Sequence, residues 1–153
     1  MHRRATGMIE KNKTFLMLKI LTPPNISFYE EHQKILDTEG YVWFCRFGKS
    51  NLRIDAITQD DNIIFIKESI KNGNHRYLLH ISDIATLAPT TNYPLYYNDI
   101  KSEQSIWFKV TSIVKLDDNF ESSFLTINDG PLSNVYRSMC NSFYIKSIKD
   151  YIY

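Results

Sequence analysis

The segment Tyr41-Val42-Trp43-Phe44-Cys45-Arg46-Phe47-Gly48 constrains the fold more than any other part of the chain. Its aromatic and β-branched residues fit a pleated, half-buried surface and indicate a β-strand. Strand alternation places Val42, Phe44 and Arg46 on one face and Tyr41, Trp43, Cys45 and Phe47 on the other. We expect the second face to be the apolar one, because the first carries Arg46. The chain must therefore bury at least one aromatic-rich sheet.

Other segments also have the composition of strands. They are residues 14–21, 63–69, 76–84, 105–116 and 142–148, with a shorter candidate at 124–127. The turn Asn72-Gly73-Asn74 separates the second and third of these and predicts an antiparallel hairpin. By contrast, residues 85–103 contain two prolines and a group of tyrosines, and we interpret them as a long loop with at most an edge strand.

Only two segments have the pattern of a helix. Ser27 followed by Glu30 forms a capping-box pattern, and Gly40 provides a stop. Phe28, His32, Ile35 and Leu36 then fall on one helical face, where His32 is interpreted as a boundary residue rather than a ligand. The second helix is expected after Pro131, with Leu132, Val135, Tyr136 and Met139 at helical spacing.

These elements predict an α+β fold. Parallel strands need a crossover connection, and two helices are too few to connect a doubly wound sheet. We therefore expect a small, mixed, strongly bent, barrel-like sheet with two or three short helices. At 153 residues the chain has the size of one domain, which we assign to residues 13–153, with residues 1–12 as a flexible tail.

Charge and cysteine content narrow the function classes. The formal net charge of +1 argues against a strongly basic duplex-coating protein and against an acidic DNA mimic. Cys45 and Cys140 lack metal-ligand spacing and are interpreted as buried thiols in a reducing compartment. No apolar run is long enough to span a bilayer. We expect a cytoplasmic protein without a metal, a cofactor or a membrane partner.

Catalytic motifs are weak. No G-x-S-x-G motif occurs, and His80, Ser82 and Asp83 share one strand too closely to form a triad. Asp55 followed by Lys67 and Glu68 has the members of a metal-dependent nuclease in the wrong order, so a nuclease is a minor alternative. The protein is more consistent with a binding function than with an enzyme.

Aromatic and polar side chains at strand ends form the candidate site. Aromatic faces stack on nucleobases, and neighbouring cations hold phosphates. The candidates are Trp43, Phe44, Arg46, Lys49, Lys67, Ser69 and Trp107. The alternative is that both tryptophans belong to the core.

The succession of these strands resembles the EVE branch of the PUA-like superfamily. The resemblance covers about residues 40–148 and includes Pro131-Leu132 opening a helix and Ser142-Phe143-Tyr144-Ile145 as a last strand. It implies a pocket for a modified or flipped base, with Trp43 or Phe44 as one stacking wall, Trp107 as the opposite wall and Ser69 as a hydrogen-bonding group. The segment after Phe47 departs from the family pattern.

Two hypotheses follow from different classes. The first is a non-enzymatic nucleic-acid-binding module, for DNA or RNA, that reads a modified or flipped base. The alternative is a protein-interaction regulator, such as an inhibitor of an anti-phage defence system from a mobile element. Tyrosine is enriched at protein interfaces, and the alternative would use Tyr93, Tyr96 and Tyr97 to bind a protein partner. The same tyrosines could instead cover a sheet edge.

Overall fold

A mixed sheet dominates the fold. In this computed structural model, residues 7–47, 62–70, 73–100, 105–117, 119–138 and 141–153 are described. The sheet has seven strands in the order β3-β6-β5-β4-β2-β8-β7. Their bounds are β2 Thr14–Leu21, β3 Val42–Phe47, β4 Ile63–Ile70, β5 Gly73–Ala85, β6 Ser105–Leu116, β7 Phe124–Thr126 and β8 Ser142–Ser147.

The sheet is mixed because one neighbouring pair, β2 and β4, runs parallel. The other neighbouring pairs are antiparallel, including the predicted hairpin of β4 and β5. The α+β class is therefore confirmed. The sheet is open rather than closed into a barrel, since β3 and β7 stand at its two ends.

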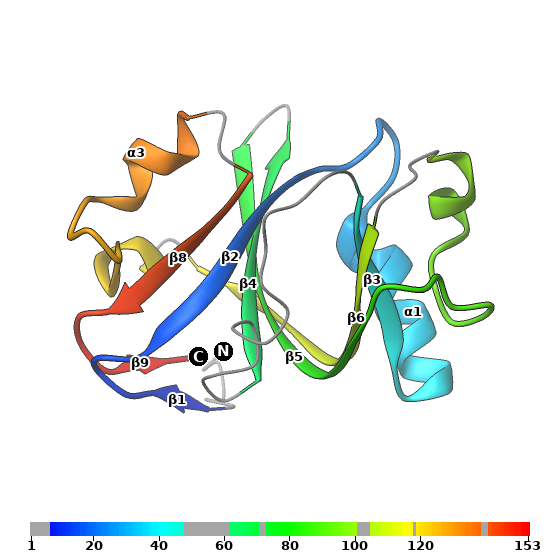
Figure 1. Cartoon of the computed structure of the whole chain (residues 1–153), viewed down its shortest axis with the longest axis horizontal. Helices are drawn as coiled ribbons and strands as arrows, with labels where there is room; N and C mark the ends of the chain where they lie inside the picture. Colours follow the sequence, from blue (N-terminus) through cyan, green and yellow to red (C-terminus); the bar gives the residue numbers. More distant parts are fainter. Residues whose placement is uncertain (1–6, 48–61, 71–72, 101–104, 118, 139–140) are drawn as a thin grey trace, which may run out of the picture.

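A bend in the sheet separates the two halves of the molecule. The β5–β6 register shifts between His80 and Ile81 and again between Ile81 and Asp83. Such bulges bend a strand and increase its local twist. β5 and β6 curve strongly in Figure 1, so that β3 and the adjoining part of β6 lie away from β2 and β8. A pocket lies between β2 and β3.

One face of the sheet packs against the helix α1 (Phe28–Glu39). Ser27 accepts a hydrogen bond from the amide of Glu30, and Gly40 ends the helix in the left-handed conformation. The predicted cap and stop are thus confirmed. The core on this face contains Leu16 and Leu18 of β2 together with Phe44 of β3.

The other face has its own core, which shorter elements cover. These are the 3-10 turn η2 (Phe120–Ser122), the helix α3 (Leu132–Tyr136), and the paired strands β1 (Met8–Ile9) and β9 (Tyr151–Ile152). Within the segment expected to be a tail, Ile9 is fully buried, because β1 pairs with β9. No helix in the described ranges is long and apolar enough to cross a bilayer.

The first and second faces of β3 are both buried, which corrects the expectation that only the Trp43 side would be apolar. Val42 and Phe44 belong to the main core beneath α1. Trp43 and Cys45 belong to a smaller cluster on the opposite side. This happens because the loop after β5, which includes the 3-10 turn η1 (Leu95–Asp99), folds over the outer side of β3.

Candidate functional site

A pocket of about 280 Å³ lies between the end of β2 and β3. Its walls also include the start of α1 and the turn η1. β2 and β3 are not hydrogen-bonded to each other, so the bent sheet leaves room between them. The lining residues are Lys19, Ile20, Leu21, Thr22, Pro23, Phe28, Phe44, Cys45, Arg46, Tyr96, Tyr97, Ile100 and Asn141.

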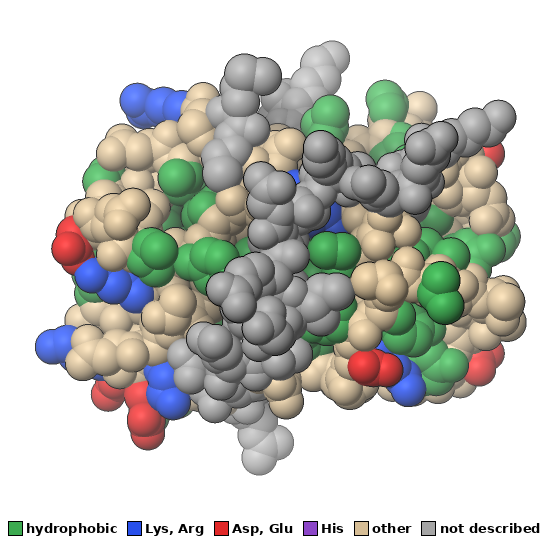
Figure 2. Space-filling view, in the orientation of Figure 1, with side chains coloured by type: hydrophobic (Ala, Val, Ile, Leu, Met, Phe, Trp, Pro, Cys, Tyr) green, Lys and Arg blue, Asp and Glu red, His purple; other side chains and the backbone are tan. Residues whose placement is uncertain are grey.

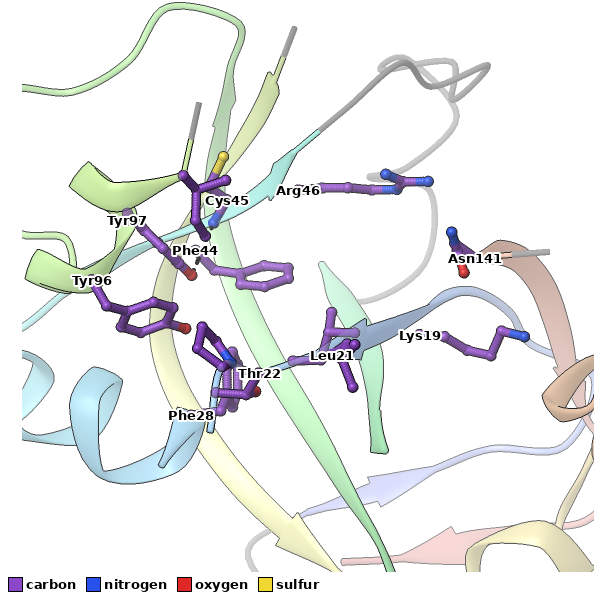
Figure 3. A pocket seen from close by; sticks show the side chains of 13 residues that line it. Lys19, Leu21, Thr22, Phe28, Phe44, Cys45, Arg46, Tyr96, Tyr97 and Asn141 are labelled. Atoms are coloured by element: carbon purple, nitrogen blue, oxygen red, sulfur yellow. Dashed lines mark hydrogen bonds between the residues drawn. The ribbon is translucent and has the colours of Figure 1, made fainter. Parts of the chain in front are cut away.

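Aromatic side chains form one side of the pocket. Phe28 and Phe44 are only 1% and 2% exposed and meet edge to face, with their ring centroids 5.7 Å apart. They form its fixed base. Tyr96 and Tyr97, which meet at 4.7 Å between centroids, form the wall next to η1 in Figure 3. Tyr96 remains partly exposed.

A buried histidine holds the tyrosine wall in place. His32 Nδ1 lies 2.8 Å from the Phe28 carbonyl oxygen, which can only accept, so Nδ1 carries the proton and donates it. His32 Nε2 then accepts a hydrogen bond from the Tyr97 hydroxyl at 2.6 Å. The Cys45 amide donates to the same hydroxyl oxygen at 3.3 Å. The hydroxyl thereby connects α1, η1 and β3.

Burial keeps the side chains of His32, Tyr97 and Cys45 uncharged. His32 is fully buried, which corrects its interpretation as a boundary residue. Burial lowers the pKa of its imidazole to about 4, while the hydrogen bond to Phe28 acts in the opposite direction. Burial also raises the pKa of Tyr97 well above its usual value and that of the Cys45 thiol to about 12. All three groups are therefore neutral at neutral pH.

The other side of the pocket is polar. Arg46, Lys19 and Asn141 lie on the side away from Tyr96 and Tyr97 in Figure 3. The Lys19 ammonium donates to the carbonyl oxygens of Val135 and Ser138, at 2.8 and 2.6 Å. The Lys19 ammonium is thus held by carbonyls around the end of α3.

A hydroxyl group lies at the base of the pocket near Phe28. Thr22 is partly exposed there and donates a hydrogen bond to Oε2 of Glu68. Glu68 is 3% exposed, and its Oε1 lies 3.3 Å from the Tyr77 hydroxyl and 3.3 Å from His75 Nδ1. The buried carboxylate is therefore surrounded by hydrogen-bond donors.

The structure does not bring all of the sequence-predicted residues together. Phe44 and Arg46 line the pocket, whereas Lys49 lies outside the described residues. Phe44 is opposite Phe108 in the sheet, and Trp107 is opposite Cys45. Because directly opposite residues share a face and the faces alternate, Phe44 and Trp107 lie on opposite faces. They cannot form two walls of one base pocket.

The tryptophans instead pack against the loop between β5 and β6 that carries Tyr93, Tyr96 and Tyr97, which we call the tyrosine loop. Trp107 is 5% exposed and meets Tyr93 and Tyr97 edge to face. A second cavity of about 270 Å³ lies beside them and is lined in part by Tyr93, Tyr97 and Trp107. Trp43 is partly buried against the same cluster. Both tryptophans therefore pack in an aromatic cluster next to β3.

The tyrosine loop also protects the edge of the sheet. The Trp43 amide donates to the Asn92 carbonyl at 2.7 Å, and the Cys45 amide donates to the Tyr97 hydroxyl. These bonds occupy backbone groups that an edge strand would otherwise present to another chain. Tyr97 is buried, and Tyr93 and Tyr96 are partly buried, so the three rings point largely inward.

Lys67 and Ser69 lie on the face of β4 opposite to Glu68, since consecutive strand residues alternate. The Lys67 ammonium is 3.3 Å from the Ser69 hydroxyl and 4.6 Å from the centre of the Tyr136 ring. Burial lowers its pKa, and the charges of Lys19 and Arg76 lower it further. Arg76 is paired with Glu121. These residues form a separate cluster beneath α3.

Neither a nuclease centre nor a metal centre is assembled in the described part of the chain. Lys67 and Glu68 face opposite sides, and Asp55 lies outside the described residues. No group of three His, Cys, Asp or Glu side chains with metal-binding geometry occurs within the described ranges. Basic side chains on the face in Figure 2 are scattered rather than gathered in one broad patch.

Sequence reasoning missed Thr22, Phe28, His32, Lys19 and Asn141 as parts of the site. Asn141 directly precedes β8 and lines the pocket together with residues that come at least 41 positions earlier in the chain, the nearest being Ile100. No local pattern marks such a meeting. Comparison of the chain with protein-family models, curated proteins and solved structures finds no match.

Proposed function

We propose that this protein is a non-enzymatic nucleic-acid-binding module that holds one base in the pocket between β2 and β3. The observation that carries the proposal is the division of this pocket into an aromatic side and a cationic side. Phe44 and Tyr96 supply aromatic surface, and Arg46 supplies positive charge across from them. A nucleotide is complementary to this division, because its base is aromatic and its phosphate is negatively charged.

The size and charge of the pocket support a ligand of one nucleotide. Its volume of about 280 Å³ is near the lower limit of about 300 Å³ for small-molecule sites. A guanidinium has N–H donors arranged to match phosphate oxygens. With a net charge of +1, the chain depends on such a local contact rather than on a broad basic surface.

The proposal includes a distant relationship to the EVE branch of the PUA-like superfamily, whose barrel-like sheet would here be opened between β2 and β3. The order of strands along the chain and a base-sized pocket beside an end of the sheet support it. The proposed pocket differs from the sequence-predicted one, because Tyr96 and Phe28 replace Trp107 as aromatic partners of Phe44.

Binding of short single-stranded DNA and RNA, plain and base-modified, tests the proposal. We expect Tyr96→Ala to weaken binding by about 1 to 3 kcal/mol, the usual contribution of one base-stacking aromatic. Arg46→Ala should weaken binding and reduce the salt slope by about one unit. Lys34→Ala is the matched control, because Lys34 is an exposed cation on α1 outside the pocket.

Folding of each variant is checked by circular dichroism and thermal unfolding. Binding that falls in both pocket variants and is unchanged in the control would support the proposal. Wild-type protein that binds none of the oligonucleotides, or binding equally sensitive to Lys34→Ala, would contradict it.

A second candidate function is a protein-interaction regulator, such as an inhibitor of an anti-phage defence system encoded on a mobile element. One observation favours it: Leu87 and Leu95, in the loop over β3, are 83% and 77% exposed. In this reading the leucines, rather than Tyr93, Tyr96 and Tyr97, make the contact. A stable complex with a purified defence protein, lost on Leu87→Ser with Leu95→Ser, would be required.

A further inference from the structure

The hydroxyl of Thr22 has a fixed hydrogen-bonding role in the pocket. Thr22 lines the pocket after the end of β2, and the single proton of its hydroxyl is donated to Oε2 of Glu68. A hydroxyl group has one donor and two acceptor lone pairs. Once the proton points at Glu68, the Thr22 oxygen can only accept hydrogen bonds from a ligand.

The surroundings of Glu68 enforce this orientation. Glu68 is 3% exposed, and its second oxygen already faces the Tyr77 hydroxyl and His75 Nδ1, each at 3.3 Å. A buried carboxylate that lost a donor would pay a large desolvation penalty. Rotating the Thr22 proton toward a ligand would remove such a donor. The Thr22–Glu68 pair is therefore a preset acceptor rather than an adaptable hydroxyl.

We propose that the pocket selects a base that carries an exocyclic amino group, and that the Thr22 oxygen accepts a hydrogen bond from this group. The inference rests on the proposed function and specifies the ligand of the same site. An amino group extends beyond the ring and carries N–H donors, so it can reach the pocket wall while the ring contacts the aromatic side. Adenine, cytosine and guanine have this group.

Deletion analogues test the inference without adding bulk to the ligand. Short single-stranded oligonucleotides carry one test base in a constant sequence, and the test bases are compared in pairs that differ by the amino group. The pairs are adenine with purine, cytosine with 2-pyrimidinone, and guanine with hypoxanthine. For the pair that binds best, we expect the amino-bearing base to bind about three- to tenfold more tightly, the usual effect of one hydrogen bond.

Variants of Thr22 assign the effect to this hydroxyl. Thr22→Val keeps the shape but removes the acceptor, so the preference within the pair should disappear. Thr22→Ser keeps the hydroxyl and should retain the preference. A preference that persists in Thr22→Val, or one that is lost in Thr22→Ser, would overturn the inference.

Glu68→Gln provides a test that keeps the Thr22 hydroxyl. The glutamine oxygen should face Tyr77 and His75, because two donors lie there, which turns its amide N–H groups toward Thr22. Thr22 would then accept from Gln and donate its own proton into the pocket. We expect the preference for the amino-bearing base to disappear or reverse, and an unchanged preference would overturn the inference.

The outcomes separate the inference from the function on which it rests. Wild-type protein that binds both members of every pair with equal affinity would overturn the amino-group inference and leave base binding intact. Wild-type protein that binds no oligonucleotide would overturn the proposed function itself. If Thr22→Val does not fold, the wild-type pairs and the Glu68→Gln variant still decide the question.

Discussion

Acid should destabilise this protein through His32. The imidazole is fully buried, donates to the Phe28 carbonyl and accepts from the Tyr97 hydroxyl. Protonation would turn Nε2 into a donor and remove the acceptor that Tyr97 uses. Burial lowers the pKa of His32 from 6.5 to about 4, so the unfolded chain binds this proton more readily than the folded chain does.

The sign and size of the effect follow from this difference. Because the folded pKa is the lower one, the stabilisation is complete above the unfolded pKa of 6.5 and is lost as the pH falls toward about 4. One pKa unit corresponds to about 1.4 kcal/mol, so the free energy of unfolding should fall by about 2 kcal/mol at about pH 5. The loss approaches about 3 kcal/mol near pH 4.

Urea unfolding at about pH 7.5 and about pH 5 measures this effect when wild type is compared with His32→Gln. The variant removes the titration, and the contributions of the other titrating groups largely cancel in the comparison. We expect the wild type to lose about 2 kcal/mol more than the variant over this interval. An equal loss in both proteins would refute the assignment of His32 as a neutral buried acceptor for Tyr97.

Three further predictions concern the fold. Gly40 adopts φ 83° with open space around it, so Gly40→Ala should cost about 1 kcal/mol in urea unfolding, from backbone strain alone; no loss would argue against the left-handed stop. A Cβ on Gly7 would lie 2.5 Å from the Tyr153 ring, so Gly7→Ala should lower stability by about 1 to 3 kcal/mol, and an unchanged midpoint would contradict this contact. In a Cys140→Ser background, Cys45 should resist thiol reagents at neutral pH because burial raises its pKa to about 12, and rapid labelling of the native state would show otherwise.

Local signals in the sequence predicted most of the elements. The Ser27–Glu30 cap and the Gly40 stop define α1, and β4 and β5 form the expected antiparallel pair, in which Gly73 belongs to β5 and pairs with Ile70. These features depend on residues that are close in sequence, so composition and spacing are sufficient to reveal them. Thr126 and its neighbours likewise form the predicted short strand β7.

Long-range pairing could not be read in the same way. Nothing in β2 marks it as the parallel partner of β4, and the pairing of Ile9 with Tyr151 joins opposite ends of the chain. We expected the last strand at 142–148 and did not predict β9. A strand of two residues is too short to show an alternating pattern.

The candidate site was predicted only in part. Phe44 and Arg46 were chosen from their place on one strand, and they do line one pocket. Trp107 was expected opposite Phe44, but the β3–β6 register pairs it with Cys45 on the other face. A shift of one residue in register changes the face of every side chain, and no motif within either strand identified this register in advance.

Isotope-labelled protein titrated with short single-stranded oligonucleotides tests the central claim most directly, because amide shifts locate the contact on the fold. The account predicts shifts concentrated at Ile20, Thr22, Cys45, Arg46 and Tyr97, which line the pocket between β2 and β3. In Tyr96→Ala, these shifts should need a higher oligonucleotide concentration, because binding is weakened by about 1 to 3 kcal/mol. Shifts that are absent, or that gather at Leu87 and along α3 instead, would contradict base binding in this pocket.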